Sequence, residues 1–397
     1  MADLEAVVRH LERIERGTAS PGEREAAEWI AQRLRELGCE AHTEAEQVHG
    51  GYWIPVGAPA AAAAGLALLA LRGGGLARLA ALAGGAVAAA SLLDDISGGA
   101  QVSRRALPTR ESRNVVAVAG DPNGERTLVL VAHHDAGHGG AVFDHSLADK
   151  IEERWPGLIG RFNTYPPIMW PTVAGPVLTA LGGLTGSRRL LGAGAAFGAG
   201  TAAAMADIAR APVSPGASDN LSAVAVLLGV AEALQAKPVT GLRVLLVSTG
   251  SEESFMEGMR RFMERWAPDL PKDRTTVVCL ETLGCPRLAL IEGEGMAWMT
   301  DYPQATRDLV ADVADEAAIG LVRGLRTRAA TDGLIALRAG YPSALLASVD
   351  QRNIPSHWHC PCDTADNVDF DTVARAIELC VALARRLALL STDLVNG

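Results

Sequence analysis

The chain has 397 residues, of which 49% are hydrophobic and 21% charged, and its formal net charge is −10 at pH 7. This length allows one large or two ordinary domains, and the acidic balance excludes the basic surface by which proteins bind nucleic acid. The six cysteines show neither the dense spacing of a disulfide scaffold nor a CxxC pair, a usage that suits a reducing compartment.

The N-terminal residues, MADLEAVVRHLERIERGTAS, are charged throughout and lack the apolar stretch of a signal peptide. A cytoplasmic start is therefore expected. Two amphipathic helices are predicted to open the chain. The first has apolar residues at helical spacing from Leu4 to Ile14, and the second, SPGEREAAEWIAQRLRELG, begins at a Ser-Pro pair and ends at Gly38.

Two long apolar segments, residues 54–93 and 167–208, interrupt the soluble pattern. The turns RGGG and GSRR divide them into halves close to the roughly 20 residues that span a bilayer, so we predict two helical hairpins. A GxxxG pattern from Gly194 to Gly198 lets helices approach closely and favours a membrane location. The many Ala, Gly and Pro residues favour the alternative, hairpins that bury each other, cover the active site or form an oligomer contact.

The remaining chain predicts an α/β fold. Its strand candidates are RNVVAVAG, RTLVLVAHHD, GLRVLLVSTG, RTTVVCLETLG and PRLALIEG, several of them almost continuously apolar, as strands covered on both faces are. A helix, DNLSAVAVLLGVAEALQAK, lies between the second and third strands and begins at an Asp-Asn cap. We predict a three-layer α/β/α sandwich with a central, mostly parallel mixed sheet, plus the two inserted hairpins. The predicted segments are residues 1–50, 112–140 and 212–397 for the α/β domain, and 51–111 and 141–211 for the inserts.

Side chains able to bind a metal stand where the predicted strands end or helices begin. In chain order they are His133, His134, Asp135, Asp219, Glu252, Glu253, Glu281, His357 and His359. Because the strand exits of one sheet converge, we expect these side chains to meet. Two histidines with three or four carboxylates suit zinc. A carboxylate outside the coordination sphere, able to take a proton from water, would explain the adjacent acids at 252 and 253.

The motifs AHHDAG, GASDN, SEES, LETLG and HCPCDTADNVD occur in this order. They resemble those of the co-catalytic dizinc aminopeptidase family, which includes bacterial leucyl aminopeptidases, glutamate carboxypeptidase II and the glutaminyl cyclases. The similarity covers residues 1–48, 112–140 and 212–390, nearly the whole chain outside the hairpins. No single motif is decisive, but five in the family's order are highly specific.

The resemblance implies two zinc ions with shared ligands, although one ion stays an alternative. The implied ligands are His133, Asp219, Glu253, Glu281 and His359, with Asp219 bridging the ions, Glu281 completing the first site and His359 the second. The family usually has Asp where Glu281 stands, which leaves the metal spacing and the occupancy of both sites open.

The resemblance also implies that Glu252 is the general base and that Asp135 orients His133 from outside the coordination sphere. His134 competes with His133 as the ligand, and His357 competes with His359. The His-x-Asp spacing favours His133, and the family's histidine four residues before an Asp-Thr pair favours His359.

Three further residue roles stay open in the sequence. Asp219 could be only a helix N-cap, the commonest use of Asp before such an apolar run. Cys360 and Cys362 could bind metal as thiolates, pack, or respond to redox state. Asp332 could shape the pocket near the metals or only cap a loop.

We therefore predict a zinc metallopeptidase, an aminopeptidase that removes N-terminal residues from peptides with Glu252 as general base. The alternatives are a glutaminyl cyclase-like acyl transfer, deacylation of N-acyl amino acids, and a non-enzymatic membrane scaffold with a degenerate peptidase fold. The expected partners are a peptide substrate and, through the hairpins, a membrane, with no nucleic acid.

The predicted location is the membrane, with the catalytic domain on the cytoplasmic side. The arginines that flank the first hairpin at 104, 105, 110 and 113 favour this orientation, whereas Arg188 and Arg189 at a hairpin tip oppose it. A soluble cytoplasmic protein is the alternative.

Overall fold

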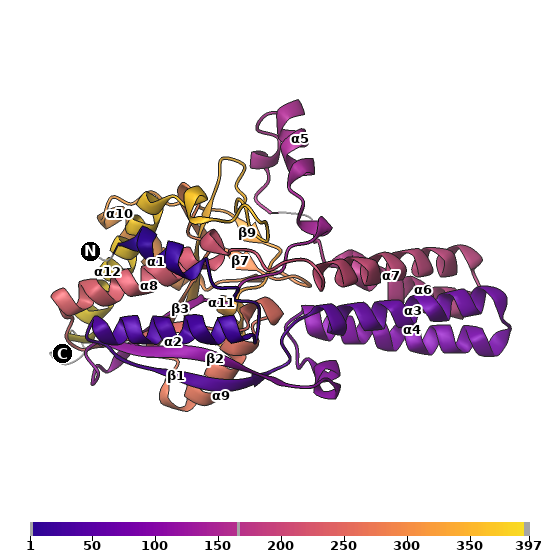
Figure 1. The fold of residues 1–397 in the computed structure, drawn as a ribbon, viewed down its shortest axis with the longest axis horizontal. Coiled ribbons are helices and arrows are strands. Elements are labelled where there is room, and N and C mark those ends of the chain that lie inside the picture. Colours follow the sequence, from indigo (N-terminus) through magenta and orange to yellow (C-terminus); the bar gives the residue numbers. More distant parts are fainter. Residues whose placement is uncertain (1–2, 165–166, 393–397) are drawn as a thin grey trace.

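A seven-stranded sheet forms the centre of the α/β domain (Figure 1) in this computed structural model, which describes residues 3–164 and 167–392. The first and last predicted segments, 1–50 and 212–397, therefore extend beyond the described residues, and the insert 141–211 includes residues 165 and 166, which lie outside them. The strands, in sheet order, are β1 (Glu40–Val48), β2 (Arg110–Gly120), β4 (Leu242–Thr249), β3 (Arg126–His133), β5 (Thr275–Glu281), β10 (Ser343–Val349) and β6 (Arg287–Ile291).

The predicted mixed sheet is confirmed, and its parallel part is the centre. The pairings β4–β3, β3–β5 and β5–β10 are parallel, whereas β1–β2, β2–β4 and β10–β6 are antiparallel. The central parallel strands all end at the same edge of the sheet. The residues that follow them are therefore brought together although the sequence separates them.

Helices cover both faces of the sheet, as predicted. One face packs against α1 (Leu4–Leu11), α2 (Pro21–Glu36), α8 (Ser222–Ala236), α10 (Gln304–Glu316) and α12 (Phe370–Thr392), and the other against α9 (Glu257–Trp266) and α11 (Asp332–Arg338). Alternate residues of β3 enter different cores: Leu128 and Leu130 face the first set of helices, and Val129 and Val131 the second. This two-sided burial explains why the strand sequences are continuously apolar.

Smaller elements lie around this sandwich. A three-stranded sheet has the order β8 (Thr300–Asp301), β7 (Gly293–Glu294) and β9 (Arg326–Thr327). The segment that follows β3 carries α5 (Ser146–Arg154), which protrudes from the domain (Figure 1).

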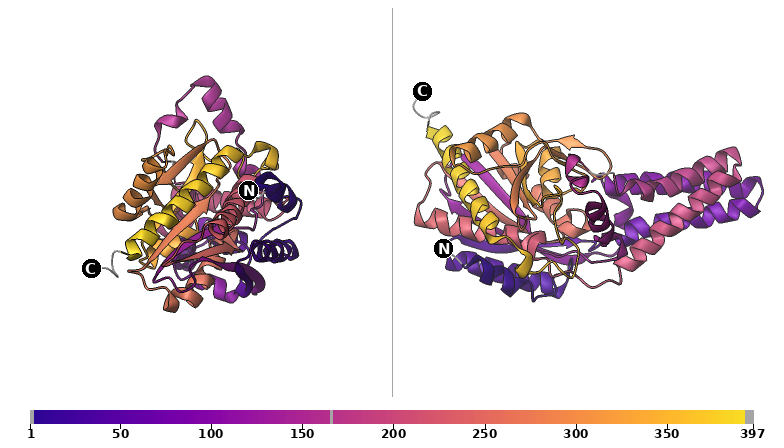
Figure 2. Two further views of the ribbon diagram at one scale, coloured as in Figure 1. Left: turned by 90° about the vertical axis from the view of Figure 1, so that its left-hand side faces the viewer. Right: turned by 90° about the horizontal axis from the view of Figure 1, so that it is seen from above.

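The two apolar segments form two helical hairpins that pack into one four-helix bundle. The first hairpin is α3 (Trp53–Arg72) and α4 (Gly75–Ile96), and the second is α6 (Trp170–Thr185) and α7 (Arg188–Ile208). Helix α3 contacts α4, α6 and α7, and α6 contacts α4 and α7. The bundle projects from one side of the α/β domain in both Figure 1 and the view from above in Figure 2.

The GxxxG glycines lie at close contacts between helices of the bundle. A Cβ on Gly198 would lie 2.7 Å from the backbone O of Ala60 in α3, and one on Gly194 would lie 2.8 Å from the backbone N of Thr179 in α6. Since real Cβ atoms do not approach so closely, these positions need glycine. The pattern therefore lets α7 pack directly against two neighbours.

The outside of the bundle is also apolar. Leu76 is 83% exposed, and Leu69, Val87 and Leu184 are exposed as well. Charged residues occur only near the helix ends: arginines at the tip, at 72, 78, 188 and 189, and aspartates at the base, at 94, 95 and 207. Helices α3, α4 and α7 are long and apolar enough to cross a membrane. The helix from Ala217 to Ala236 has such a composition too, but it is buried in the α/β core.

Candidate metal centre

The side chains proposed from the sequence come from five points along one edge of the sheet. His133 ends β3, Glu281 ends β5, and Glu252 and Glu253 form a short turn after β4. The other two residues belong to loops: Asp219 lies in the turn before α8 and His359 in the loop before α12.

Asp219 lies between two groups of candidate ligands. Its Oδ1 is 3.2 Å from His133 Nε2, which is also 3.5 Å from Glu281 Oε1. Its Oδ2 is 3.7 Å from His359 Nε2, which is 3.0 Å from Glu253 Oε2. The structure thus brings all five predicted ligands together, with one oxygen of Asp219 facing each histidine.

The donor set of this cluster fits zinc. One ligand atom each from His133, Asp219 and Glu253 lies within 4.8 Å of the others. Within the described residues, Glu281 Oε2 is buried without a hydrogen-bond partner. Several carboxylates and two imidazoles held together away from water need a cation to offset their charge, and imidazole nitrogen with carboxylate oxygen is a combination that zinc accepts.

The tautomer of His133 is fixed by the chain itself. Its Nδ1 lies 3.0 Å from the backbone O of Asp135. Because a carbonyl oxygen can only accept, Nδ1 carries a proton and donates it, so in the neutral ring the lone pair of Nε2 is directed at Asp219 and Glu281. This is the state of an imidazole that binds a metal.

The crowding of charge perturbs the acid–base equilibria of the cluster. Burial opposes the charged form of His359, but the adjacent Glu253 carboxylate outweighs this effect and raises the pKa of His359 to about 9. Burial raises the pKa of Glu281 to about 8, against the attraction of His133. A cation in the cluster would favour the neutral imidazoles and the ionised carboxylates, the forms in which these groups bind metal.

Glu252 lies at the side of the cluster. Its Oε2 is 3.9 Å from His133 Nε2, and its side chain is 11% exposed. Burial raises the pKa of Glu252 well above its usual range, and the carboxylates of Glu281 and Asp332 act in the same direction. A carboxylate in this position can exchange protons with a group in the cluster.

Asp135 holds the turn that carries both glutamates. Its Oδ1 accepts the backbone N–H of Glu252 at 3.0 Å, and its Oδ2 accepts the backbone N–H of Glu253 at 3.1 Å and the hydroxyl of Thr18 at 3.0 Å. The sequence predicted only a contact with His133, whose Nδ1 lies 3.5 Å from Asp135 Oδ1. The carboxylate of Asp135 therefore serves the loop after β4 as well as the histidine that ends β3.

Asp363 does the same for the turn that carries Asp219. It accepts the backbone N–H of Ser218 at 2.7 Å and that of Asp219 at 3.1 Å. The next peptide bond, between Asp219 and Asn220, is cis. The sequence offered Asp363 only as a landmark for His359, because its burial and its contacts with residues 218 and 219 are visible only in the fold.

The competing candidates lie outside the cluster. His134 is fully buried beside Ser248, with its Nδ1 3.0 Å from the hydroxyl, and burial lowers its pKa to about 4. Cys360 and Cys362 form a disulfide, so they offer no thiolates to a metal and differ from the reduced state that the sequence suggested. His357, in the same loop, is partly buried.

Asp332 lies at the start of α11 and faces the cluster from another element. Its carboxylate accepts the hydroxyl of Thr249, the last residue of β4. Asp332 is 1% exposed, which fits a buried pocket residue better than a solvent-exposed loop cap, and this burial raises its pKa to about 7.

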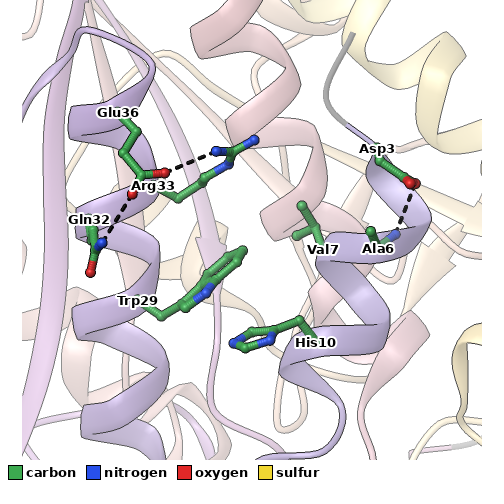
Figure 3. Close-up of a pocket in the computed structure, with 8 residues that line it drawn as sticks. All are labelled: Asp3, Ala6, Val7, His10, Trp29, Gln32, Arg33 and Glu36. Carbon is green, nitrogen blue, oxygen red and sulfur yellow. Dashed lines mark hydrogen bonds and ion pairs between the residues drawn. The ribbon is translucent and has the colours of Figure 1, made fainter.

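A surface hollow between α1 and α2 contains none of these residues (Figure 3). Its polar side chains satisfy one another: Arg33 bonds Glu36, Asp3 caps α1, and His10 stacks on Trp29 with ring centroids 4.8 Å apart. We assign it no part in the chemistry.

The fold and the cluster define the class of protein, an α/β/α sandwich with a candidate metal centre at the ends of its central strands. Residues 202–384 match the model of peptidase family M28, and this stretch holds four of the five motifs. The resemblance seen in the sequence is thereby confirmed, and the chain carries a metallopeptidase domain. No curated protein matches the chain in sequence.

Solved structures share the fold at low sequence identity. The LapA aminopeptidase of Legionella pneumophila is 11% identical with a TM-score of 0.54, over 97% of this chain and 71% of that one. The zinc aminopeptidase BSAP of Bacillus subtilis is 13% identical with a TM-score of 0.53, over 96% and 93% of the two chains. The glutaminyl cyclase of Tannerella forsythia is 14% identical with a TM-score of 0.56, over 96% and 97%.

Proposed function

We propose that the protein is a zinc-dependent aminopeptidase that removes N-terminal residues from peptides. The observation that carries this proposal is the position of Asp219, with one carboxylate oxygen towards His133 and the other towards His359. This arrangement suits a carboxylate shared by two ions, as in co-catalytic hydrolases. The family match supports the peptidase chemistry.

In this proposal His133 and Glu281 would hold one zinc, His359 and Glu253 would hold the other, and Asp219 would be shared by both. Bound zinc would polarise the scissile carbonyl and lower the pKa of the attacking water. Five ligands, one of them shared, are enough for two zinc ions. Glu281 is one methylene longer than the Asp that the family usually has at this position.

Glu252 is the proposed general base. It takes the proton of the attacking water and passes it to the nitrogen of the leaving amine as the amide bond breaks. Asp135 keeps Glu252 in place through the backbone and holds the ring of His133 in its metal-binding tautomer. Each of these functions belongs to a group that the fold holds in place before substrate arrives, the backbone O of Asp135 included.

The bundle is proposed to lie in a membrane. Helices α3, α4 and α7 have 20, 22 and 21 residues, which at roughly 1.5 Å per residue match a hydrocarbon core of about 30 Å. Their charges stand at the two ends, and large apolar side chains such as Leu76 and Leu69 are exposed between them. The sequence allowed either membrane hairpins or hairpins that bury each other. The two are compatible, because the hairpins bury each other inside the bundle while the outside of the bundle is apolar.

An assay of purified protein tests the activity. Aminoacyl chromogenic substrates should be hydrolysed, and a chelator should abolish turnover until zinc is restored. Release of pyroglutamate from Gln-peptides without free amino acids would instead indicate the acyl transfer of a glutaminyl cyclase. Hydrolysis of N-blocked substrates alone would indicate a deacylase, and turnover of none of these substrates would indicate a scaffold.

Cell fractionation tests the location. The protein should sediment with membranes and need detergent for release, whereas recovery in the soluble fraction without detergent would contradict the membrane proposal.

A further inference from the structure

A buried arginine joins the base of the bundle to the loop of the proposed base. Arg104 lies in a short helix (Val102–Ala106) that follows α4, and its side chain is 1% exposed. Its Nε and Nη2 donate to the two carboxylate oxygens of Asp95, at 2.6 and 3.0 Å. Asp95 belongs to the last turn of α4 and is itself fully buried. Arg104 is one of the arginines that flank the first hairpin in the sequence, and in the structure it is buried.

The same guanidinium reaches the catalytic loop. Its Nη1 donates to the backbone O of Ser254 at 2.8 Å, and Ser254 directly follows the two glutamates. The guanidinium also lies 5.3 Å from the ring centroid of Phe255 and 3.4 Å from Glu257 Oε2. One side chain thus spans from the end of a bundle helix to the loop that carries Glu252 and Glu253.

This loop needs such support because its backbone is unfavourable. Ser251, Phe255 and Met256 have φ values of 55°, 65° and 57°, in the left-handed region that non-glycine residues seldom adopt. Such conformations persist only where the surroundings hold them. Asp135 holds one side of the loop, and Arg104 holds the other side through Ser254.

We infer that Arg104 and Asp95 are positioning residues for Glu252 and Glu253, so that the bundle is a structural part of the active site as well as an anchor. Asp95 fixes the plane of the guanidinium with two hydrogen bonds, and the guanidinium fixes the carbonyl of Ser254 with a third. This inference rests on the proposed function for the roles of Glu252 and Glu253. The contacts themselves do not depend on it.

Replacing both Asp95 and Arg104 distinguishes a role in positioning the loop from a role in stabilising the fold. Removing one partner of a buried ion pair leaves an unpaired charge and destabilises the fold, whereas replacing both with apolar residues of similar volume is often neutral or stabilising. Glu257 keeps three other donors, the backbone N–H groups of His49 and Gly50 and the hydroxyl of Ser254. The double variant Asp95→Leu/Arg104→Met should therefore fold.

The test compares this double variant with wild type in thermal stability, steady-state kinetics and zinc affinity, the last measured by competition with a chromophoric chelator. We expect an unchanged melting temperature, a kcat lowered at least ~10-fold with KM within about twofold, and zinc affinity weakened by ~10-fold, the size typical of residues that orient ligands. A stable double variant with wild-type kcat and zinc affinity would overturn the inference.

Arg104→Lys tests the same point without removing the charge. Lysine cannot make the fork of hydrogen bonds to Asp95 and also reach Ser254, so we expect kcat to fall here too. Arg105→Lys is the matched control, since it is the same substitution on the exposed neighbour and should change nothing. Wild-type kcat and zinc affinity in Arg104→Lys would overturn the inference even if the double variant failed to fold. A wild-type protein without peptidase activity would contradict the proposed function, while zinc competition would still test the positioning role.

Discussion

Asp135 accepts the backbone N–H of Glu252 at 3.0 Å, so the residue that follows β3 fixes the proposed base that follows β4. The two strands are parallel neighbours and pair from Arg126 with Leu242 to His133 with Thr249. Their ends therefore lie side by side, and a carboxylate from one can hold the loop of the other. This relationship explains how the two adjacent glutamates acquire different directions.

Asp135→Asn should lower kcat more than it weakens substrate binding. The amide side chain offers one acceptor in place of two, so it would lose the N–H of Glu252 or of Glu253, and its NH2 group would face a donor. We expect a ~10- to 100-fold loss in activity or metal affinity. Steady-state kinetics at saturating zinc measure it, with Thr18→Val as a milder comparison because it removes only one donor to Asp135. Equal activity of Asp135→Asn and wild type would contradict this role.

Glu252→Gln should abolish turnover and leave zinc bound. The substitution keeps the size of the side chain and removes its ability to take a proton, and general bases contribute typically ~10²- to 10⁴-fold in rate. Glu253→Gln, one residue further, should instead weaken zinc binding because Glu253 contacts His359. Zinc content and kcat measured on both variants separate the two roles. Full activity in Glu252→Gln would contradict the mechanism.

Glu281→Gln should weaken one zinc more than the other. Its carboxylate lies by His133 and away from the pair of His359 and Glu253, so its loss affects the first site. We expect that site to lose at least ~10-fold in affinity, while Glu281→Asp, the residue usual in the family, keeps the charge and retains zinc. A zinc titration of the three proteins measures this. Identical titrations of wild type and Glu281→Gln would show that Glu281 is no ligand.

The sequence predicted the central strands because their two-sided burial leaves an unmistakable apolar run. Strand β1 was harder, since it turns Glu44 and Glu46 towards the protein, where they meet Arg265 and Trp266 of α9. Acidic side chains that point inward reverse the usual pattern of an edge strand, in which apolar residues face the protein and polar residues face solvent. Strand β10, SALLASV, consists mainly of Ser, Ala and Leu and has a single β-branched residue, Val349, so it shows little of the composition that marks a strand.

The candidate site, like the sheet, has a part that the sequence predicts and a part that it does not. Its ligand candidates could be proposed because strand ends and family motifs coincide. The residues that hold them could not, since Asp363, Thr18 and Arg104 act through backbone groups distant in the chain. No spacing rule predicts such contacts, because each depends on how loops from different elements meet.

Glu294 should make the protein less stable as pH rises. Burial raises the pKa of Glu294 to about 7 although it accepts bonds from Tyr302 and Thr331. The folded form therefore binds this proton more tightly than the unfolded form. The resulting stability is fully present below about pH 4.5 and is lost as the pH rises through 7, by on the order of 3 kcal/mol.

Glu294→Gln isolates this effect from that of other buried acids. The variant should lose less stability than wild type between pH 5 and pH 8, as measured by denaturant unfolding in the same detergent. Parallel pH profiles for the two proteins would contradict the assignment.

The tip of the bundle should face the outside of the cell if the catalytic domain is cytoplasmic, as the sequence predicts. Gly74 is the position to test, because a Cβ there would have no atom within 4 Å and the nearby arginines mark the tip. Gly74→Cys should react with a membrane-impermeant maleimide in intact cells. Asn123→Cys, exposed between β2 and β3, should react only after permeabilisation. Cys39, Cys279, Cys285 and Cys380 are buried and give a low background.

The Cys360–Cys362 disulfide and the arginines of the tip argue for the opposite orientation, since disulfides persist in oxidising compartments and arginines favour the cytoplasmic side. Labelling of Asn123→Cys but not Gly74→Cys in intact cells would establish that orientation instead.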